Sequence, residues 1–241
     1  MIWSYDLVVD SHDVDYNGVV KSSSLMRYMQ EAGFQQLQTL GPTPDQLRQS
    51  GRAFLLSRAA LSVYGIMRRL DKLTVQTWAC ESKGASFIRS ARIYRGETLM
   101  CEMVTIWALV DFTKGQLLRV SDLDLPFPVG TPLDLVNDIK LRIPGHAALN
   151  LVGEFHVGYS WCDENMHMNN TRYPDMFADF LSTLEGQRIV NIIFSYAAEA
   201  KLGEVLKIFR SEPSEEGKVY FRAVGNDDKV RCEAEIIIEM I

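Results

Sequence analysis

The sequence has few cysteines and no metal-binding spacing among them. Cys80, Cys101, Cys162 and Cys232 stand far apart and form no CxxC pair. The spacing of cysteine zinc ligands is therefore absent. A disulfide framework is also not expected, because it is typical of much shorter secreted chains.

Long apolar runs and an excess of positive charge are missing as well. No stretch approaches the ~20 uncharged apolar residues of a membrane-spanning helix, and the first residues have neither the basic start nor the apolar core of an export signal. Lys and Arg number 25 against 31 Asp and Glu, which gives a net charge of −6. We therefore expect neither nucleic acid nor membrane as a partner. The cluster Arg89, Arg92 and Arg95 is interpreted as solvated strand ends, with contact to an acidic partner as the alternative.

What is present is a globular composition and an ordered pattern of elements. The chain has 241 residues, of which 47% are apolar and 23% charged, enough for two domains of about 100–150 residues. The pattern predicts a strand over 1–10, then a helix over 22–40 that its serines cap and Gly41-Pro42-Thr43-Pro44 ends, then strands over 54–64, 73–81, 86–94 and 99–112. With no helix between the later strands, a parallel α/β fold is excluded. We expect an α+β fold, an antiparallel sheet wrapped around one helix.

The same order then repeats. The proline-rich segment 126–148 reads as a linker between a domain over 1–125 and a second domain over 149–241. The second domain is expected to contain a helix over 170–184 and strands over 151–160, 189–197, 205–211, 219–224 and 231–241.

Internal alignment supports a duplication. Residues 15–19 (DYNGV) align with 163–167 (DENMH), 148 positions later, and residues 62–64 align with 194–196, 132 positions later. Cys101-Glu102 aligns with Cys232-Glu233, 131 positions later. The drop from 148 to 132 predicts about sixteen additional residues in the first copy, as a loop over 41–52.

The copies differ at two polar positions. Asp and Asn occur in both, but His167 replaces Val19, and Glu199 is aligned with Met67. Polar groups that differ together suggest one site in the second copy, formed by Asp163, Asn165, His167 and Glu199.

These residue types suit thioester hydrolysis. If Asp163, Asn165 and His167 alternate along an extended segment, their side chains point one way, toward amides at a helix start capped by Asn169 and Asn170. Such amides can stabilise an oxyanion. Asp163 or Glu199 can activate water or attack, His167 can move protons, and Asn165 can hold an oxygen.

Other interpretations of these residues stay open. The segment could be only a turn with polar caps, and Glu199 only a strand-end charge. A metal site at Asp163 and His167 lacks a third ligand of standard spacing. Cys162 would point away from both in an alternating segment, which disfavours it as a nucleophile.

At these residues the chain resembles the acyl-acyl carrier protein thioesterases, a family of double hotdog enzymes. Residues 163–170 (DENMHMNN) match its D-x-N-x-H-x-N-N segment, and 196–200 (YAAEA) keep the Tyr and Glu of its Y-x-x-E-C pattern. Ala200 replaces the cysteine of plant members. The first half resembles the family through its opening SYDLVVDSHDVD, through residues 56–58 and through 71–78.

The resemblance implies two tandem hotdog units, each with a sheet wrapped around a long helix. It implies an acyl pocket in a non-catalytic first half, with Met26, Met29 and Trp107 among the residues that close it, and catalysis in the second half. The substrate would be an acyl group on acyl carrier protein, released as free fatty acid without metal or organic cofactor. A bacterial cytoplasmic member is implied, because the transit peptide of plant members is not found. An acyl-CoA thioesterase and a non-catalytic acyl-binding protein are the alternatives; chain-length preference and oligomeric state stay open, a homodimer included.

Overall fold

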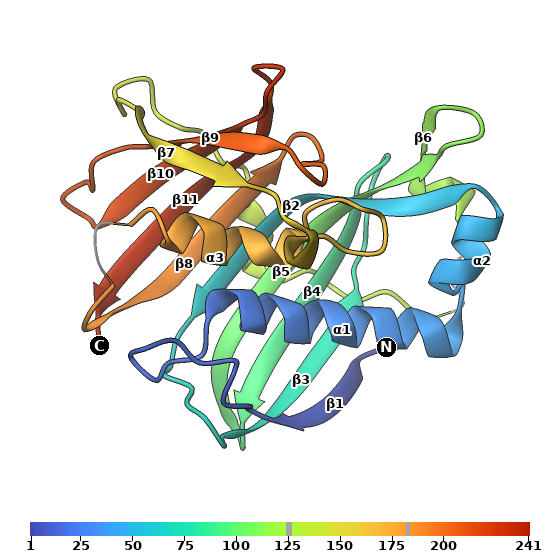
Figure 1. The fold of residues 1–241 in the computed structure, drawn as a ribbon. Helices are drawn as coiled ribbons and strands as arrows, with labels where there is room; N and C mark the ends of the chain where they lie inside the picture. The colour runs from blue at the N-terminus through green and yellow to red at the C-terminus, as the bar shows by residue number, and fades with distance from the viewer. Residues whose placement is uncertain (124–126, 182–183) are drawn as a thin grey trace.

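The described residues, 1–123, 127–181 and 184–241, form one twisted sheet with the helices α1 (Ser22–Leu40) and α3 (Tyr173–Ala178) on its concave side (Figure 1). This is a computed structural model. The first half contains β1 (Trp3–Val8), α1 (Ser22–Leu40), α2 (Pro44–Gln49), β2 (Arg52–Val63), β3 (Lys72–Ala79), β4 (Phe87–Arg95), β5 (Thr98–Asp111) and β6 (Gln116–Leu118). The second half contains β7 (Asn150–His156), α3 (Tyr173–Ala178), β8 (Gln187–Tyr196), β9 (Val205–Arg210), β10 (Lys218–Val224) and β11 (Val230–Met240). Short 3₁₀ helices are η1 (Val120–Asp122), η2 (Asp134–Asn137), η3 (Tyr159–Trp161) and η4 (Asn170–Arg172).

The sheet confirms the predicted α+β class and joins the halves side by side. Its strand order is β1-β3-β4-β5-β2-β8-β11-β10-β9-β7, with β6 added beside β5, and the paired strands are antiparallel. The halves meet where β2 pairs with β8. Asn191 Nδ2 donates to Ser62 Oγ across this seam at 2.9 Å. The edge strands β1 and β7 lie at opposite ends of the sheet, one from each half.

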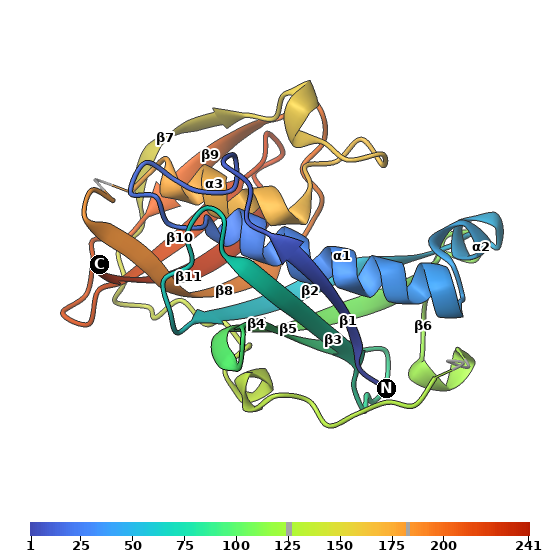
Figure 2. The same ribbon diagram turned by 90° about the horizontal axis from the view of Figure 1, so that it is seen from below.

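Helix α1 crosses the first half with its apolar face on the sheet (Figure 2). Met26, Met29 and Ala32 are fully buried, as the helical spacing of apolar residues predicts. The expected serine cap is wrong. The N-cap residue is Lys21, without a side-chain bond, because the buried Ser24 lies inside the helix and donates to Asp13 instead.

Asp13 anchors the start of α1. Its carboxylate is 6% exposed and accepts hydrogen bonds from Ser24 Oγ at 3.1 Å, from Arg27 and from the Tyr28 hydroxyl. Burial raises the pKa of Asp13, but the bonds from Tyr28 and Arg27 lower it by more, so the net pKa lies below the usual 3.8. Its ionised form therefore stabilises the fold.

We expect Asp13→Asn to lower the free energy of unfolding by about 2 kcal/mol at neutral pH, because three donors lose a charged acceptor. A carboxyl whose pKa is depressed on folding stabilises above its unfolded pKa and loses that effect as pH falls through the folded value. The wild type should therefore lose stability below about pH 4 more steeply than the variant. Urea unfolding across this range measures both slopes, with the exposed Asp10→Asn as control. Equal slopes for wild type and Asp13→Asn would contradict this account.

The second helix is much shorter than predicted. The expected helix over 170–184 is the 3₁₀ helix η4 followed by the six-residue α3; 182–183 lie outside the described residues. After Ala178 the amides of Phe180 and Leu181 bond three residues back, so the chain leaves the α-helix. Both side chains still pack against the core, and their spacing imitated a further helical turn. The prediction of a long helix in each unit is therefore wrong for the second.

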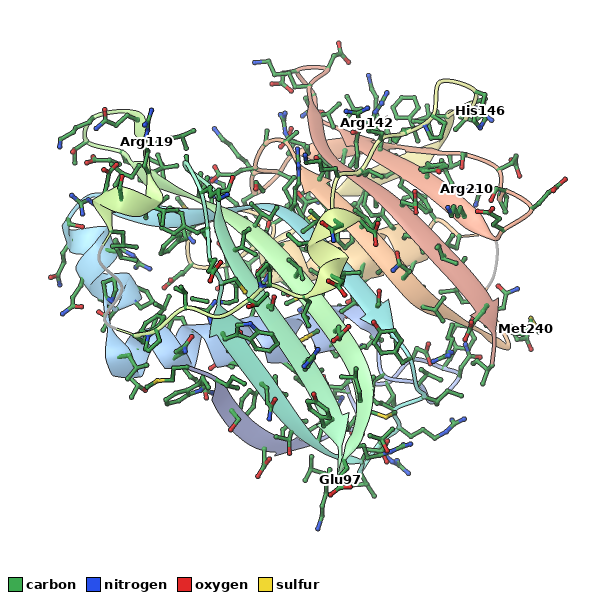
Figure 3. All side chains as sticks on the ribbon, turned by 180° about the vertical axis from the view of Figure 1, so that it is seen from behind. Glu97, Arg119, Arg142, His146, Arg210 and Met240 are labelled. Carbon is green, nitrogen blue, oxygen red and sulfur yellow. The ribbon has the colours of Figure 1, made fainter. Side chains whose placement is uncertain are left out.

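The segment that connects the halves packs against the convex face of the sheet (Figures 2 and 3). Leu133 and Ile139 are buried against Trp78, whose indole N–H donates to the carbonyl of Thr131 at 3.0 Å. Gly130 adds a parallel bridge to Cys80. The predicted boundary between 125 and 126 lies outside the described residues.

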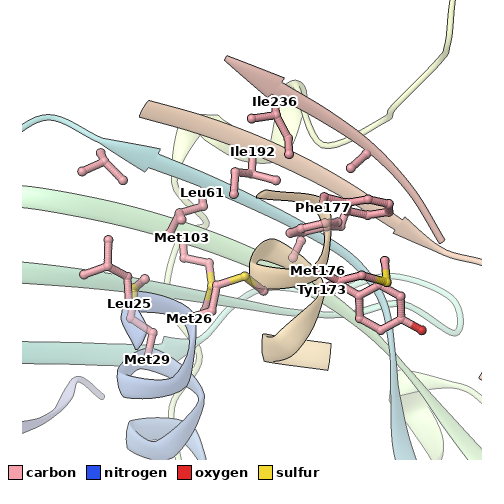
Figure 4. Close-up of a cluster of buried hydrophobic side chains, with 14 of the residues drawn as sticks. Leu25, Met26, Met29, Leu61, Met103, Tyr173, Met176, Phe177, Ile192 and Ile236 are labelled. Atoms are coloured by element: carbon pink, nitrogen blue, oxygen red, sulfur yellow. The ribbon is translucent and has the colours of Figure 1, made fainter. Parts of the chain in front are cut away.

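One apolar core runs through both halves (Figure 4). Side chains of α1, such as Leu25 and Met29, share a cluster with Met176 and Phe177 of α3 and with Ile192 of β8. Because the cluster is continuous, we expect the halves to unfold together. None of the described helices is long and apolar enough to cross a membrane.

The additional residues of the first copy form helix α2 rather than a loop. Thr43 Oγ1 accepts from the Gln46 amide, and the Gln46 side chain accepts from the Thr43 amide, which completes a capping box. Pro44 stands at the first helical position. Proline marked a stop in the sequence, but here it also starts the next helix.

Candidate active site

Residues 163–167 form a tight turn, not the extended segment predicted. The Asp163 amide donates to the His167 carbonyl at 2.9 Å, and the Met166 amide donates to the Asp163 carbonyl at 3.0 Å. Asp163 Oδ1 accepts from the Asn165 amide at 2.9 Å. Met166 adopts φ +62°, so strand alternation does not align the side chains of Asp163, Asn165 and His167.

The first copy folds into the same turn. The Asp15 amide donates to the Val19 carbonyl at 2.8 Å, and Asp15 Oδ1 accepts from the Asn17 amide at 2.9 Å. Gly18, with φ +70°, stands where Met166 stands. The aspartate in each copy thus holds a turn, which explains why it persists in both.

Backbone bonds correct the alignment of the next segment by one residue. The Val20 amide donates to the Met67 carbonyl, and the Met168 amide donates to the Ala200 carbonyl. Since Val20 and Met168 are equivalent, Met67 corresponds to the buried Ala200 and not to Glu199. Glu199 corresponds to Ile66, and the first copy has fifteen additional residues rather than sixteen (148 against 133).

The correction keeps the contrast between the copies. The paired residues Val63 and Cys101 of the first half correspond to the paired residues Tyr196 and Cys232 of the second half. Tyr196 is therefore equivalent to Val63 and not to Tyr64. An apolar residue, Ile66, still stands where the second copy has an acid.

His167 and Glu199 meet. His167 Nε2 lies 3.1 Å from Glu199 Oε2, with side-chain exposures of 28% and 44%. Main-chain contacts fix the pair, because His167 bridges to Lys201 and the Leu202 amide donates to the Met166 carbonyl. An imidazole with a carboxylate partner at this distance can take and return a proton.

The two asparagines have different surroundings. Asn17 Nδ2 donates to the carbonyls of Leu184 and Gln187 at 2.7 and 3.0 Å, and its Oδ1 accepts from the Gly186 amide at 3.1 Å. The side chain of Asn165 has no hydrogen-bond partner among the described residues and lines a cavity.

The difference follows from α2. The segment before β8, which Asn17 binds, corresponds in the first half to the segment before β2, where α2 is inserted. There Arg48 of α2 pairs with Glu164, a residue of the second turn. The insertion replaces the short connection, so the second asparagine faces open space.

That space is a cavity of about 1120 Å³ between α1, α2 and the first-half strands. Apolar residues on its wall include Met29, Phe54, Phe87 and Trp107, and Asn165 and Asn169 line it from the second half. Met29 and Trp107, two of the residues predicted to close the acyl pocket, thus line this cavity.

Other predicted site residues lie elsewhere. Met26 is fully buried in the core and does not line the cavity, so that part of the prediction is wrong. Asp163, His167, Glu199 and Asn170 are not on the cavity wall either. Of the turn residues, Asn165 lines the cavity, whereas His167 and its partner Glu199 lie outside the cavity wall.

The predicted helix start keeps few free amides. Asn169 caps η4 as expected, but its side chain accepts from the Thr171 amide at 2.9 Å and its carbonyl accepts from the Arg172 amide at 2.9 Å. The Asn170 amide has no acceptor among the described residues, while the Asn170 carbonyl accepts from the Tyr196 hydroxyl at 3.0 Å. Tyr196 thereby braces η4.

Cys162 lines the cavity but is poorly suited to attack. Burial and the nearby Asp163 raise the pKa of its thiol, and its Sγ lies 3.6 Å from the Gly158 carbonyl. The thiol therefore stays protonated near neutral pH. No cluster of three or more metal-ligating side chains occurs among residues 1–123, 127–181 and 184–241.

Arg89 is the cavity residue that the sequence interpretation misplaced. Its side chain lines the cavity, whereas Arg92 pairs with Glu102 and Arg95 with Asp71 near the surface. A three-residue spacing on a strand puts neighbours of a cluster on opposite faces. The prediction of solvated strand ends is thus wrong for Arg89, and strand parity was the signal that could have shown it.

Two sequence families match the chain. The model of the thioesterase-like superfamily matches residues 9–128, and that of the acyl-ACP thioesterase C-terminal domain matches residues 147–239. No curated protein sequence matches.

Several solved structures share the fold over the whole chain. An acyl-ACP thioesterase from Bacteroides thetaiotaomicron is 22% identical with a TM-score of 0.82, covering 99% of this chain and 98% of its own. An oleoyl thioesterase from Lactobacillus plantarum is 19% identical with a TM-score of 0.85, covering 100% and 97%. The 12:0-ACP thioesterase from Umbellularia californica is 14% identical with a TM-score of 0.84, covering 100% and 98%. At these identities the likeness shows the double hotdog fold.

Proposed function

The chain belongs to the acyl-ACP thioesterase family, and we propose that it hydrolyses an acyl-acyl carrier protein to free fatty acid and carrier protein. The observation that carries the assignment of the site is the contact between His167 Nε2 and Glu199 Oε2, which are 3.1 Å apart. His167 follows the cavity-lining Asn165 by two positions in the sequence. We propose that the first half holds the acyl chain and the second half supplies the chemistry, with residues 126–148 as the connection.

The residues can divide the reaction as follows. Asn165 Nδ2 donates to the thioester oxygen as the carbonyl carbon becomes tetrahedral. We place that carbon at the edge of the cavity, between Asn165 on its wall and the His167–Glu199 pair outside it. The pair accepts a proton from water while the water oxygen bonds to the carbon. The carbon–sulfur bond then breaks, and His167 returns the proton to the departing thiolate. Asp163 acts as a positioning residue, because its Oδ1 accepts a hydrogen bond that stabilises the turn containing Asn165 and His167.

The test is hydrolysis by the purified full chain of matched acyl-carrier-protein and acyl-CoA substrates, followed by free fatty acid release. We expect the carrier-protein substrates to have the higher kcat/KM. A preference for CoA would make the protein an acyl-CoA thioesterase, and tight binding without release would make it an acyl-binding protein. We expect the protein to act in the cytoplasm; sedimentation would distinguish a monomer from a homodimer.

The two equivalent asparagines provide a matched pair of variants. We expect Asn165→Ala to lower kcat/KM by about 10²-fold with little change in stability, because its side chain contributes one hydrogen bond to the transition state. Asn17→Ala should lower the free energy of unfolding by about 2 kcal/mol and leave kcat/KM nearly unchanged, because it removes bonds between the halves. Kinetics and urea unfolding of both variants measure the contrast. If Asn17→Ala caused the larger kinetic defect, the catalytic side would be wrongly assigned.

A further inference from the structure

Arg89 places a positive charge inside the proposed acyl cavity. It lies on β4 between Phe87 and Ala91, and all three line the cavity. The flanking residues are those of a hydrocarbon pocket, so a guanidinium at this position needs an explanation. Burying a charge is costly unless it is paired.

Its contacts leave the charge without a counterion. Nη1 donates to Gln36 Oε1 at 2.6 Å and to Thr77 Oγ1 at 3.2 Å, and both acceptors are neutral. Arg89 forms no ion pair with a carboxylate of the described ranges, and its Nε and Nη2 have no hydrogen-bond acceptor there. Burial lowers the pKa of Arg89 to about 10, so the group is still charged at neutral pH.

The facing surface of α1 adds space and further donors. A side chain at Gly33 would come within 3.2 Å of Arg89 Cδ, so glycine lets the helix approach the arginine. Gln30 lines the cavity with its Nε2 buried and unpartnered, and the Nε2 of the fully buried Gln36 has no partner either. Arg89 and Gln30 thus both line the cavity with donor groups that no described residue pairs, and an acceptor on the cavity's occupant would satisfy the guanidinium.

We infer that the acyl group accepted by this cavity carries an acceptor oxygen beyond the thioester, best a carboxylate at its far end, which Arg89 binds. The inference rests on the proposed function and names its substrate class. A guanidinium matches a carboxylate with two parallel hydrogen bonds. A methyl-terminated chain would instead cover the charge without a partner, which opposes binding.

Ligand binding tests the inference without turnover. Dodecanoate, 12-hydroxydodecanoate and dodecanedioate compete with a fluorescent fatty acid for the full chain. We expect the wild type to bind dodecanedioate at least about tenfold more tightly than dodecanoate, with the hydroxy acid between them, since a charge-assisted pair exceeds a neutral hydrogen bond. In Arg89→Met this order should be lost or inverted.

Two further variants make the result specific. Arg92→Met removes an arginine of the same strand that pairs with Glu102 and should keep the wild-type preference. Arg89→Lys keeps the positive charge and should retain part of the preference for dodecanedioate. It provides the test if Arg89→Met does not fold. If the wild type preferred dodecanoate, or if Arg89→Met kept the wild-type preference for dodecanedioate, the inference would be overturned. Arg89 would then only link β4 to α1.

Hydrolysis separates this inference from the proposed function. Preferential cleavage of the ω-carboxyacyl carrier protein supports both. Binding preference without cleavage of any acyl thioester would refute the enzyme assignment alone. Cleavage of methyl-terminated substrates with rejection of oxygenated ones would refute the inference alone.

Discussion

His167→Ala is expected to lower kcat/KM by about 10³-fold, within the range typical of general acid–base groups. The imidazole is the one group of the pair that can both take a proton from water and give it to a thiolate near neutral pH. Its 3.1 Å contact with Glu199 holds it in place. Steady-state hydrolysis of the preferred acyl thioester measures the effect.

The pair itself can be tested with Glu199→Gln. This variant should also lose activity, and the double variant should be little worse than His167→Ala, because groups that act as a unit are not additive. His146→Ala removes an exposed histidine of the connecting segment and should be as active as the wild type. A fully additive double variant would mean that the two residues do not act together.

Phe177→Ala is expected to lower the free energy of unfolding by about 3–5 kcal/mol, the usual range for a buried phenylalanine. Phe177 is fully buried, and its ring centroid lies 4.9 Å from that of Phe221 and 6.2 Å from that of Phe194. A helix of six residues cannot form on propensity alone, so this packing holds α3 in place. Chemical denaturation measures the change.

The effect of Phe177→Ala should reach the active turn as well, because α3 continues directly from η4, next to the turn. Phe112→Ala is the matched control: Phe112 is 59% exposed, and its loss should change stability by no more than about 0.5 kcal/mol. A similar loss in both variants would show that burial at position 177 does not carry α3.

Much of the fold could be predicted because apolar periodicity reports burial directly. Helix α1 begins and ends at the residues that the apolar spacing predicts, and most of the predicted strands begin and end within two residues of the observed ones. The second helix could not be predicted in length, because Phe180 and Leu181 satisfy helical spacing while packing from turns. Periodicity detects which side chains are buried, not the backbone that presents them.

The candidate site was predictable in composition but not in detail. The difference between Val19 and His167 identified the turn over 163–167 as the candidate site. The alignment of Glu199 with Met67, however, was wrong by one residue. A shared tyrosine made Tyr64 look equivalent to Tyr196, and only the backbone bonds resolve the shift. Arg89 was misinterpreted because a charged residue on a strand usually faces solvent.

The hydrogen bonds of Asn17 to the segment before β8 have a consequence for the number of ligands that each chain binds. Two equivalent turns exist in each chain, but one is tied to the connection before β8 and the other faces a cavity that α2 keeps open. Each polypeptide should then take up one acyl equivalent, and a single titration would reach saturation at a ratio of one rather than two. A symmetric pair of units with two short connections would have no such open site, so the asymmetry created by one insertion sets the number of ligands.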